Sequence, residues 1–241
     1  MLRDRPGALG ASSDVGAATA RAASQAGARV VLIARREDRI RHLADELGEA
    51  VPIRCDVTDA GQVAAAVRTA TDTFGRIDVL CNIAGQGPHA PVEQIDPDDF
   101  RSVLELNLIA PLVTMQAVLP IMRKQAAGSI VNVSSGITFA ALPGSAAYGA
   151  SKAGLNKLTA VERAELADAG IAVSMMYPFI TDTEFTESLR GDIESASQLE
   201  SSHAPKPQSP EQVAEAILDL IKTGAEQTGL VPEQFGGSYK G

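Results

Sequence analysis

Two side chains that can exchange a proton lie four residues apart in this sequence, at Tyr148 and Lys152. On a helix, this spacing projects both side chains from one face. A phenol with a pKa of about 10 is a poor acid or base at neutral pH. A lysine ammonium about 4 Å away contributes up to about 4 kcal/mol at an effective dielectric of about 20, or about three pKa units. The pair therefore predicts a Tyr148 that works near neutral pH, although the spacing alone is a weak signal.

Two further polar residues could complete this chemistry. Ser135 precedes Tyr148 at the end of an expected strand, and its hydroxyl could hold a carbonyl oxygen while the tyrosine donates a proton. A serine after a strand is, however, more often a turn former. Asn107 lies in the segment LELNLIAP of an expected helix, where an asparagine is more often solvated or associated with a bend. Whether these four residues meet depends on the elements that carry them.

Those elements alternate along the chain between strand-like apolar runs and helix-like stretches, which is typical of a parallel sheet built from βαβ units. Hydrophobic residues make up 45% of the sequence and aromatic residues 4%, so the core must consist of Val, Ile, Leu and Ala. This composition favours a sheet covered by helices on both faces. We therefore expect an α/β fold with a doubly wound, Rossmann-type sheet, and one domain over residues 1–241.

The apolar pattern gives approximate bounds for these elements. We expect strands at residues 28–34, 51–56, 77–82, 129–134 and 171–177, a short last strand at 229–231, and helices at 37–47, 58–74, 96–125, 148–167 and 209–222. Thr58 is the expected N-cap of the second of these helices, and Pro111 and Pro120 should bend the third. Residues 184–209 have weak periodicity, which predicts a mobile lid over a substrate.

Ligands of open α/β sheets bind beyond the carboxyl ends of the strands, and several candidate residues fall there. The segment LGASSDVG, residues 9–16, opens a helix whose N-terminus could hold a pyrophosphate, although a glycine-containing turn alone is more often structural. Arg35 and Arg36 follow the strand at 28–34, where a site for NAD normally holds an acid. The basic pair favours the 2′-phosphate of NADP, although such a pair elsewhere would be two solvated charges.

Composition limits the other partners. The formal charge of −9 and a pI near 4.9 argue against nucleic acid. There is no run of eighteen or more apolar residues and no signal-peptide pattern, so we expect a cytoplasmic protein without a membrane partner. Cys55 and Cys81 each belong to a β-type run and are expected to be small core residues in a reducing compartment. No metal site is predicted.

The motifs FGRIDVLCNIAG (residues 74–85), SIVNVSSG (129–136) and YGASKAGL (148–155) occur in order, and with them nearly the whole chain resembles the short-chain dehydrogenase/reductase family, similar to its NADP-dependent ketoreductases. The resemblance implies an active-site tetrad of Asn107, Ser135, Tyr148 and Lys152. Tyr148 would be the acid or base, Ser135 would orient the substrate oxygen, Lys152 would lower the tyrosine pKa and bind the nicotinamide ribose, and Asn107 would anchor a water relay. It also implies a homodimer or homotetramer through the helices that carry Asn107 and Tyr148.

The strand ends and the resemblance together predict an NADP site. Asp56 and Val57 would meet the adenine, residues 82–85 would line the cofactor, and Thr181 and Thr183 would touch the carboxamide region. The full set of expected cofactor-binding residues is Gly10, Ser12, Ser13, Val15, Gly16, Arg35, Arg36, Asp56, Val57, Asn82, Ala84, Gly85, Tyr148, Lys152, Pro178, Phe179, Thr181 and Thr183.

Three positions depart from the family pattern. Pro6 and Gly7 fall where the first, central strand is expected, which predicts a short or irregular strand. Asp14 replaces a glycine of the phosphate loop, where it would either repel a pyrophosphate or serve the helix N-terminus. Phe179 replaces the glycine after Pro178, where it would either narrow the nicotinamide pocket or form an aromatic wall beside it.

Two hypotheses follow. The first is an NADP-dependent oxidoreductase that moves a hydride between nicotinamide and a small-molecule carbonyl or alcohol. The second is a catalytically silent cofactor-sensing or scaffold protein with the same fold, suggested by the altered first strand and phosphate loop. The sequence does not name the substrate.

Overall fold

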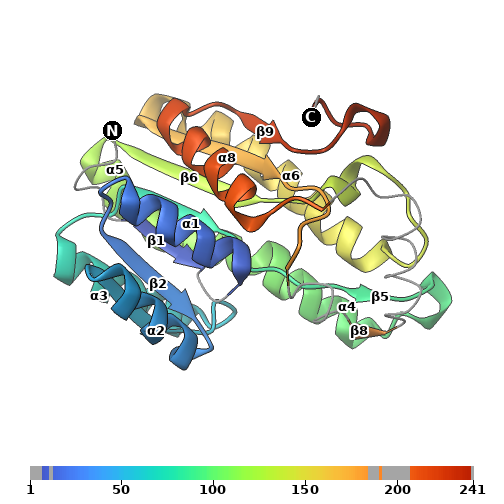
Figure 1. The fold of residues 1–241 in the computed structure, drawn as a ribbon, viewed down its shortest axis with the longest axis horizontal. Helices are drawn as coiled ribbons and strands as arrows, with labels where there is room; N and C mark the ends of the chain where they lie inside the picture. The colour runs from blue at the N-terminus through green and yellow to red at the C-terminus, as the bar shows by residue number, and fades with distance from the viewer. Residues whose placement is uncertain (1–6, 11–12, 184–189, 192–206, 240–241) are drawn as a thin grey trace.

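The computed structural model describes residues 7–10, 13–183, 190–191 and 207–239. Their centre is a seven-stranded sheet in the order β3-β2-β1-β4-β6-β7-β9, in which every pair of neighbours is parallel (Figure 1). The order reverses direction between β1 and β4, so the crevice at their carboxyl ends is the topological switch point where ligands of such sheets bind. The expected doubly wound sheet is confirmed.

The elements follow the alternating apolar pattern of the sequence. The strands are β1 Gly7–Gly10, β2 Val30–Ala34, β3 Ala50–Arg54, β4 Val79–Asn82, β5 Pro88–His89, β6 Gly128–Val133, β7 Ile171–Tyr177, β8 Arg190–Gly191 and β9 Gln227–Gly229. The α-helices are α1 Asp14–Gln25, α2 Glu37–Leu47, α3 Ala60–Phe74, α4 Pro97–Leu104, α5 Ala110–Gln125, α6 Ala146–Leu166 and α8 Pro210–Thr223. Short 3-10 turns lie at Val92–Gln94, Gly136–Phe139, Ala167–Ala169 and Glu233–Phe235.

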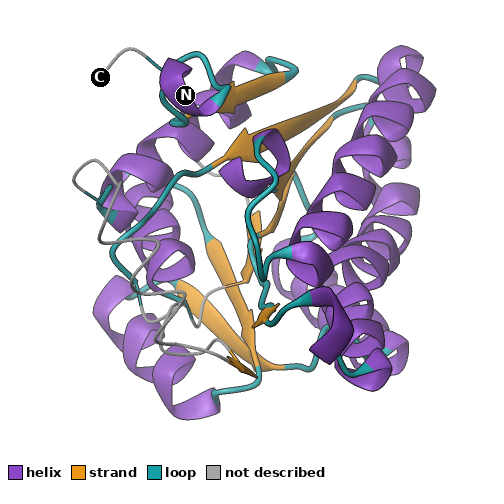
Figure 2. Cartoon of the chain, turned by 90° about the vertical axis from the view of Figure 1, so that its right-hand side faces the viewer, coloured by secondary structure: helices purple, strands orange, loops and turns teal. Residues whose placement is uncertain are grey.

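Helices cover both faces of the sheet and form a hydrophobic core on each, and the side chains of β2 alternate between these two cores. Val30, Leu32 and Ala34 pack with α1, α2 and α8, whereas Val31 packs with α3, α5 and α6. This alternation follows from the two-residue period of a strand. Figure 2 shows the sheet between the two helical layers. A strand buried on both faces reads as a continuous apolar run, which is why VVLIA is recognisable in the sequence.

One expected detail holds and two are revised. The central strand β1 is four residues long, as the glycine and the preceding proline predict, and Pro6 itself lies outside the described residues. Asp59 caps α3, in place of the expected Thr58, because its carboxylate accepts from the backbone N–H groups of Gly61 and Gln62. The last strand, β9, lies two residues earlier than expected, at Gln227–Gly229.

The long helix expected at 96–125 is interrupted. The interruption is a π-helical turn at Glu105–Ile109, just before Pro111. The backbone N–H of Ala110 donates to the carbonyl of Glu105, five residues back. Pro111 follows at once and lacks an N–H, so the ordinary ladder cannot continue there. By length and composition alone the helix Pro97–Gln125 could cross a membrane. Met115 and Met122 are nevertheless fully buried against the sheet, as in a core helix of an α/β domain.

The predicted lid at 184–209 falls mostly outside the described residues, which exclude 184–189 and 192–206. Two of its residues form β8, which pairs in parallel with β5. Its last part is not a lid: Gln208 is buried, and its backbone N–H donates to the carbonyl of Ile180. Ser209 then caps α8 in a capping box with Gln212, as the sequence predicts.

Candidate active site

Tyr148 and Lys152 lie on the first two turns of α6, and Ser135 is the second residue after the end of β6. The hydroxyls of Tyr148 and Ser135 share a hydrogen bond. Lys152 is 3% exposed, and its Nζ donates to the carbonyl of Val133 at 2.9 Å. That Nζ lies 5.9 Å from the centre of the Tyr148 ring. The fold therefore brings together the end of β6 and the start of α6, as the strand-end argument requires.

Asn107 is fully buried within the π-helical turn. Its Oδ1 accepts from the backbone N–H of Gln86 at 3.0 Å, and its Nδ2 donates to the Gln86 carbonyl at 2.7 Å. Nδ2 also donates to Ser151 Oγ at 2.9 Å, on the helix that carries Tyr148 and Lys152. Asn107 therefore connects the segment after β4 to α6, and its partner Gln86 was not predicted from the sequence.

The pKa of Tyr148 moves in the opposite direction from the one expected. Burial raises it to about 12, and the hydrogen bond with Ser135 lowers it in part. Burial also lowers the pKa of Lys152 to about 8, so the ammonium itself is disfavoured in this site. At neutral pH the site therefore holds a protonated phenol beside a mostly charged lysine.

The glycine-containing loop leads into the N-terminus of α1. Gly10 is the last residue of β1, Ser12 lies outside the described residues, and Ser13 is the N-cap of α1. The Ser13 hydroxyl accepts from the backbone N–H of Gly16 at 3.2 Å. Val15 and Gly16 lie in the first helical turn, and Asp14 is its acidic first residue. This position favours the second of the two readings of Asp14, because a carboxylate there stabilises the positive end of the helix.

At the next two strand ends, the expected specificity residues are exposed or half-buried. Arg35 and Arg36 directly follow β2 and are both exposed. One carboxylate oxygen of Asp56, which follows β3, already accepts two hydrogen bonds. Its Oδ1 accepts from the backbone N–H of Thr58 at 3.0 Å and from the Thr58 hydroxyl at 2.8 Å. The half-buried Val57 stands beside it. Both sets remain accessible at the carboxyl edge of the sheet.

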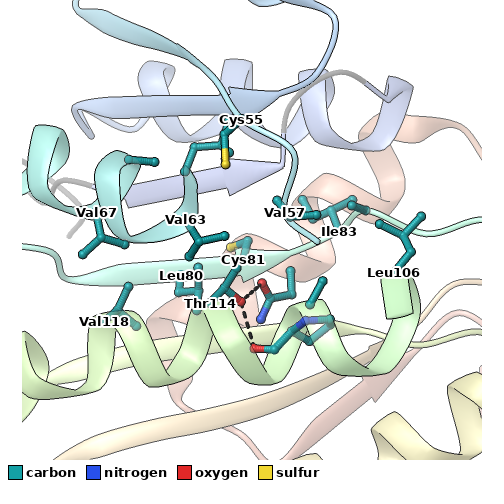
Figure 3. A pocket seen from close by; sticks show the side chains of 16 residues that line it. Cys55, Val57, Val63, Val67, Leu80, Cys81, Ile83, Leu106, Thr114 and Val118 are labelled. Carbon is teal, nitrogen blue, oxygen red and sulfur yellow. Dashed lines mark hydrogen bonds between the residues drawn. The ribbon is translucent and has the colours of Figure 1, made fainter. Parts of the chain in front are cut away.

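An apolar pocket opens between these strand ends and the helices α3 and α5. Figure 3 shows Val57, Ile83 and Leu106 gathered at one end of it. Ala84 lines the same pocket, together with the side chain of Asn82. Asn82 is held internally: its Nδ2 donates to Asn132 Oδ1 and its Oδ1 accepts from the Thr114 hydroxyl, each at 2.8 Å. A flat aromatic group is the kind of ligand that such apolar walls accept.

The two cysteines also line this pocket (Figure 3). Both are free and buried, as the sequence predicts. Burial raises the pKa of the Cys55 thiol to about 11 and that of the Cys81 thiol to about 12, so both are neutral and unreactive near pH 7. Among the described residues, no group of three or more His, Cys, Asp or Glu side chains could hold a metal ion.

The segment after β7 contains the remaining predicted residues. The carbonyl of Pro178 accepts from the backbone N–H of Gly136 at 2.8 Å, next to Ser135. The hydroxyl of Thr181 donates to the Phe179 carbonyl at 3.0 Å, and that of Thr183 to the Thr181 carbonyl at 3.4 Å. These hydroxyls are turned toward their own backbone, and no contact described for them reaches the tetrad.

Phe179 packs against the C-terminal segment. Its ring lies 4.9 Å from that of Phe235, and it contacts Gly136 and Val231. Gln208, which the sequence did not single out, secures this arrangement: its Oε1 accepts from the backbone N–H of Phe179 at 3.2 Å and its Nε2 donates to the Leu230 carbonyl. This packing places the ring of Phe179 beside Gly136, the residue after Ser135.

Comparisons with known proteins agree with this architecture. The sequence profile of the family described as short chain dehydrogenase matches residues 8–194. An uncharacterized oxidoreductase of Staphylococcus epidermidis is 34% identical over 179 residues, which cover 74% of this chain and 78% of that protein.

Two solved structures share the fold. A short-chain dehydrogenase/reductase of Burkholderia phymatum in complex with NAD superposes with a TM-score of 0.90 at 23% identity, covering 98% of this chain and 92% of that one. A 3-ketoacyl-(acyl-carrier-protein) reductase of Brucella melitensis complexed with NADH gives a TM-score of 0.85 at 24% identity, covering 95% and 98%. With the profile match and the curated relative, this arrangement of sheet, helices and motifs shows that the chain belongs to the short-chain dehydrogenase family of oxidoreductases.

Proposed function

We propose that this protein is an NADP-dependent oxidoreductase that interconverts a carbonyl and an alcohol through Ser135, Tyr148 and Lys152. The observation that carries the proposal is the hydrogen-bonded pair of Tyr148 and Ser135 next to a lysine that is 3% exposed. Burying a lysine costs free energy unless its charge is paired and hydrogen-bonded, and titratable groups with shifted pKa values cluster at functional sites. The test is NADPH oxidation with a panel of carbonyl compounds.

The residues at the strand ends fit a nicotinamide dinucleotide. The α1 N-terminus would hold the pyrophosphate, and the apolar walls of Val57, Ala84 and Leu106 would take the adenine. At Gly85 an added Cβ would lie 3.1 Å from Lys152 Nζ, so the glycine leaves that face of the lysine open for a ribose. The ammonium of Lys152 has three donor hydrogens, and the Val133 carbonyl takes one of them.

When bound, NADPH supplies the hydride that reduces the carbonyl carbon. The hydroxyl of Tyr148 donates its proton to the carbonyl oxygen, which becomes the alcohol oxygen, and in the reverse direction the phenolate takes that proton back. Ser135 donates a hydrogen bond that holds the same oxygen. Lys152 stabilises the phenolate that remains, and Asn107 keeps α6 and the segment after β4 in register.

The raised phenol pKa predicts opposite pH dependences for the two directions. Reduction needs a protonated Tyr148, and a pKa of about 12 keeps the phenol protonated at neutral pH. Oxidation of an alcohol needs the phenolate, whose population rises with pH. We expect the oxidation rate to rise steadily between about pH 7 and pH 10, while the reduction rate shows no phenol-dependent rise. Oxidation rates independent of pH over this range would contradict Tyr148 as the base.

The two solved structures with this fold hold NAD and NADH, so they do not support a preference for NADP. The proposed preference rests on Arg35 and Arg36 of this chain. Charge-assisted contacts to a 2′-phosphate contribute about 1.5 to 3 kcal/mol each. We expect NADPH to bind more tightly than NADH in calorimetric titrations, and Arg35→Ala and Arg36→Ala to weaken NADPH about 10- to 100-fold with little effect on NADH.

Arg123→Ala is the matched control. This exposed arginine lies in the last turn of α5, near the amino end of β6, and the proposed cofactor site lies at the carboxyl ends of the strands. It should change neither affinity. Equal affinity of the wild-type protein for the two cofactors, or tighter binding of NADH, would remove the NADP assignment and leave the oxidoreductase assignment in place.

The remaining expectations belong to the same proposal: one dinucleotide-binding domain in the cytoplasm, acting on a small molecule as a homodimer or homotetramer. The apolar exposed residue Ile109, 38% accessible on the helix that carries Asn107, and Val161, 42% accessible on α6, support association through these helices. A scaffold protein of this fold would bind NADPH but oxidise it with none of the carbonyl compounds, and its association would be unaffected by Tyr148→Phe.

A further inference from the structure

We propose that Gly87 is a positioning residue for Tyr148, which sets the direction of the phenol ring and so of its hydroxyl. The inference rests on the proposed function, because it takes Tyr148 as the proton donor. Gly87 is buried, and a Cβ added to it would lie 2.7 Å from Tyr148 Cβ and 2.9 Å from both Cγ and Cδ2 of the ring. These separations are shorter than any contact between two carbon atoms that are not bonded. Only the bare backbone of a glycine can therefore lie against this side of Tyr148.

Gly87 belongs to a strap, residues 85–90, that runs from the end of β4 across the tetrad. The strap is fixed at its first end. Gln86 exchanges two hydrogen bonds with the side chain of Asn107, and Gly85 lies against Lys152 and Asn107. One short segment thus contacts three of the four proposed catalytic residues through its backbone.

The far end of the strap is also fixed. The backbone N–H of Ala90 donates to the Gly144 carbonyl at 3.0 Å, and the imidazole of His89 packs on the same glycine, just before α6 begins. Residues 88–89 pair with β8, which follows the segment after β7. The strap is therefore held on both sides of Gly87, and it cannot move away from Tyr148 without breaking these contacts.

A methyl group at Gly87 would consequently displace Tyr148 itself. The Cβ of Tyr148 is fixed by the backbone of α6, so the ring must rotate or the first turn of α6 must shift. Either movement takes the hydroxyl away from Ser135 and from the carbonyl oxygen of a substrate. A misplacement of about 1 Å in an active site can cost about 100-fold in rate.

The test is Gly87→Ala, with Gly149→Ala as the matched control. Gly149 is the next residue after Tyr148, and a Cβ added to it meets nothing within 4 Å. We expect Gly87→Ala to lower kcat for carbonyl reduction about 10- to 100-fold and to change the NADPH dissociation constant less than about twofold. Gly149→Ala should leave both unchanged. Unchanged kcat in Gly87→Ala, or loss of NADPH binding together with activity, would overturn the positioning role.

The pH profile adds a readout that a merely structural change does not move. The hydrogen bond from Ser135 lowers the pKa of Tyr148. A displaced ring loses this bond, so its pKa should rise and the increase of the alcohol oxidation rate with pH should move to higher pH in Gly87→Ala. An unshifted profile would count against the displacement.

A third measurement does not depend on turnover. The chain has three tyrosines, so NMR with ring-labelled tyrosine gives a simple spectrum in which Tyr148→Phe identifies the Tyr148 signal. Gly87→Ala should move that signal far more than Gly149→Ala does. If the wild-type protein reduces no carbonyl compound, the proposed function fails while this spectrum still decides the contact, and an unmoved Tyr148 signal overturns the inference.

Discussion

Tyr148→Phe is expected to lower carbonyl reduction about 100- to 10,000-fold while leaving the NADPH dissociation constant within about twofold. The substitution removes the hydroxyl that is bonded to Ser135 and retains the ring that packs against Gly87. The general acid is lost, but the fold around the site is kept. Stopped-flow measurement of NADPH oxidation, with calorimetric titration of NADPH, separates these two quantities. Comparable rates in the two proteins would remove Tyr148 from the mechanism.

Lys152 and Ser135 provide the contrast to this variant. Lys152→Ala removes a charge beside the phenol and the donor to the Val133 carbonyl, so activity and NADPH affinity should fall together. Lys152→Met retains most of the buried chain and separates loss of charge from loss of packing. Ser135→Ala should mainly lower kcat, because it deletes one hydrogen bond to the reacting oxygen. A scaffold protein would show none of these differences in rate, only changes in NADPH binding.

The sequence predicts the framework well where one local pattern decides the structure. The strand β2 is a continuous apolar run, β6 and β7 are mostly apolar, and α8 has its own start signal in Ser209 and Pro210. The π-helical turn at Glu105–Ile109 was not predicted. Pro111 predicts that the helix is disturbed, but it does not predict how the backbone hydrogen bonds rearrange. The pairing of β5 with β8 was not predicted either, because two-residue strands have no period to detect.

The candidate site also contains some residues that the sequence motifs predict and others that they do not. The motifs locate Asn107, Ser135, Tyr148 and Lys152, and the fold brings them together at the carboxyl edge of the sheet. The direction of the Tyr148 pKa could not be predicted, because it depends on how much water reaches the phenol after folding. Gln86 and Gly87 were missed because they act through their backbones, which leave no residue-type signal. Gln208 was missed because its side-chain amide bonds to backbone groups of segments distant in sequence.

Glu162 carries the second large expected effect, on stability and not on catalysis. This residue of α6 is 7% exposed, and among the described residues its Oε2 has no hydrogen-bond partner. The neighbouring Arg163 does not neutralise it, because its guanidinium donates to the carbonyls of Val173 and Gly224. Burial, with a smaller contribution from Glu165, raises the pKa of Glu162 to about 7. An uncompensated carboxylate therefore sits in the protein interior above that pH.

The sign of the pH effect follows from this raised pKa. Between the ordinary value of 4.5 and about 7, the folded protein holds a proton that the unfolded chain releases, so the free energy of unfolding falls as pH rises through this range. Below it both states are protonated and the penalty is absent. Above it both are ionised and the penalty is complete, at about 3 kcal/mol if each pKa unit is worth about 1.4 kcal/mol.

Glu162→Gln keeps the shape of the side chain and removes the titration. We expect the variant to gain about 2 to 3 kcal/mol over the wild-type protein at about pH 8, relative to the difference between the two at about pH 5, in urea unfolding experiments. Glu215→Gln is the control, since this glutamate of α8 is exposed and its replacement should change stability by less than about 0.5 kcal/mol at both pH values. If the difference in unfolding free energy between Glu162→Gln and wild type is the same at the two pH values, Glu162 does not carry a buried charge. All other groups that titrate in this range are shared by the two proteins and cancel in the difference.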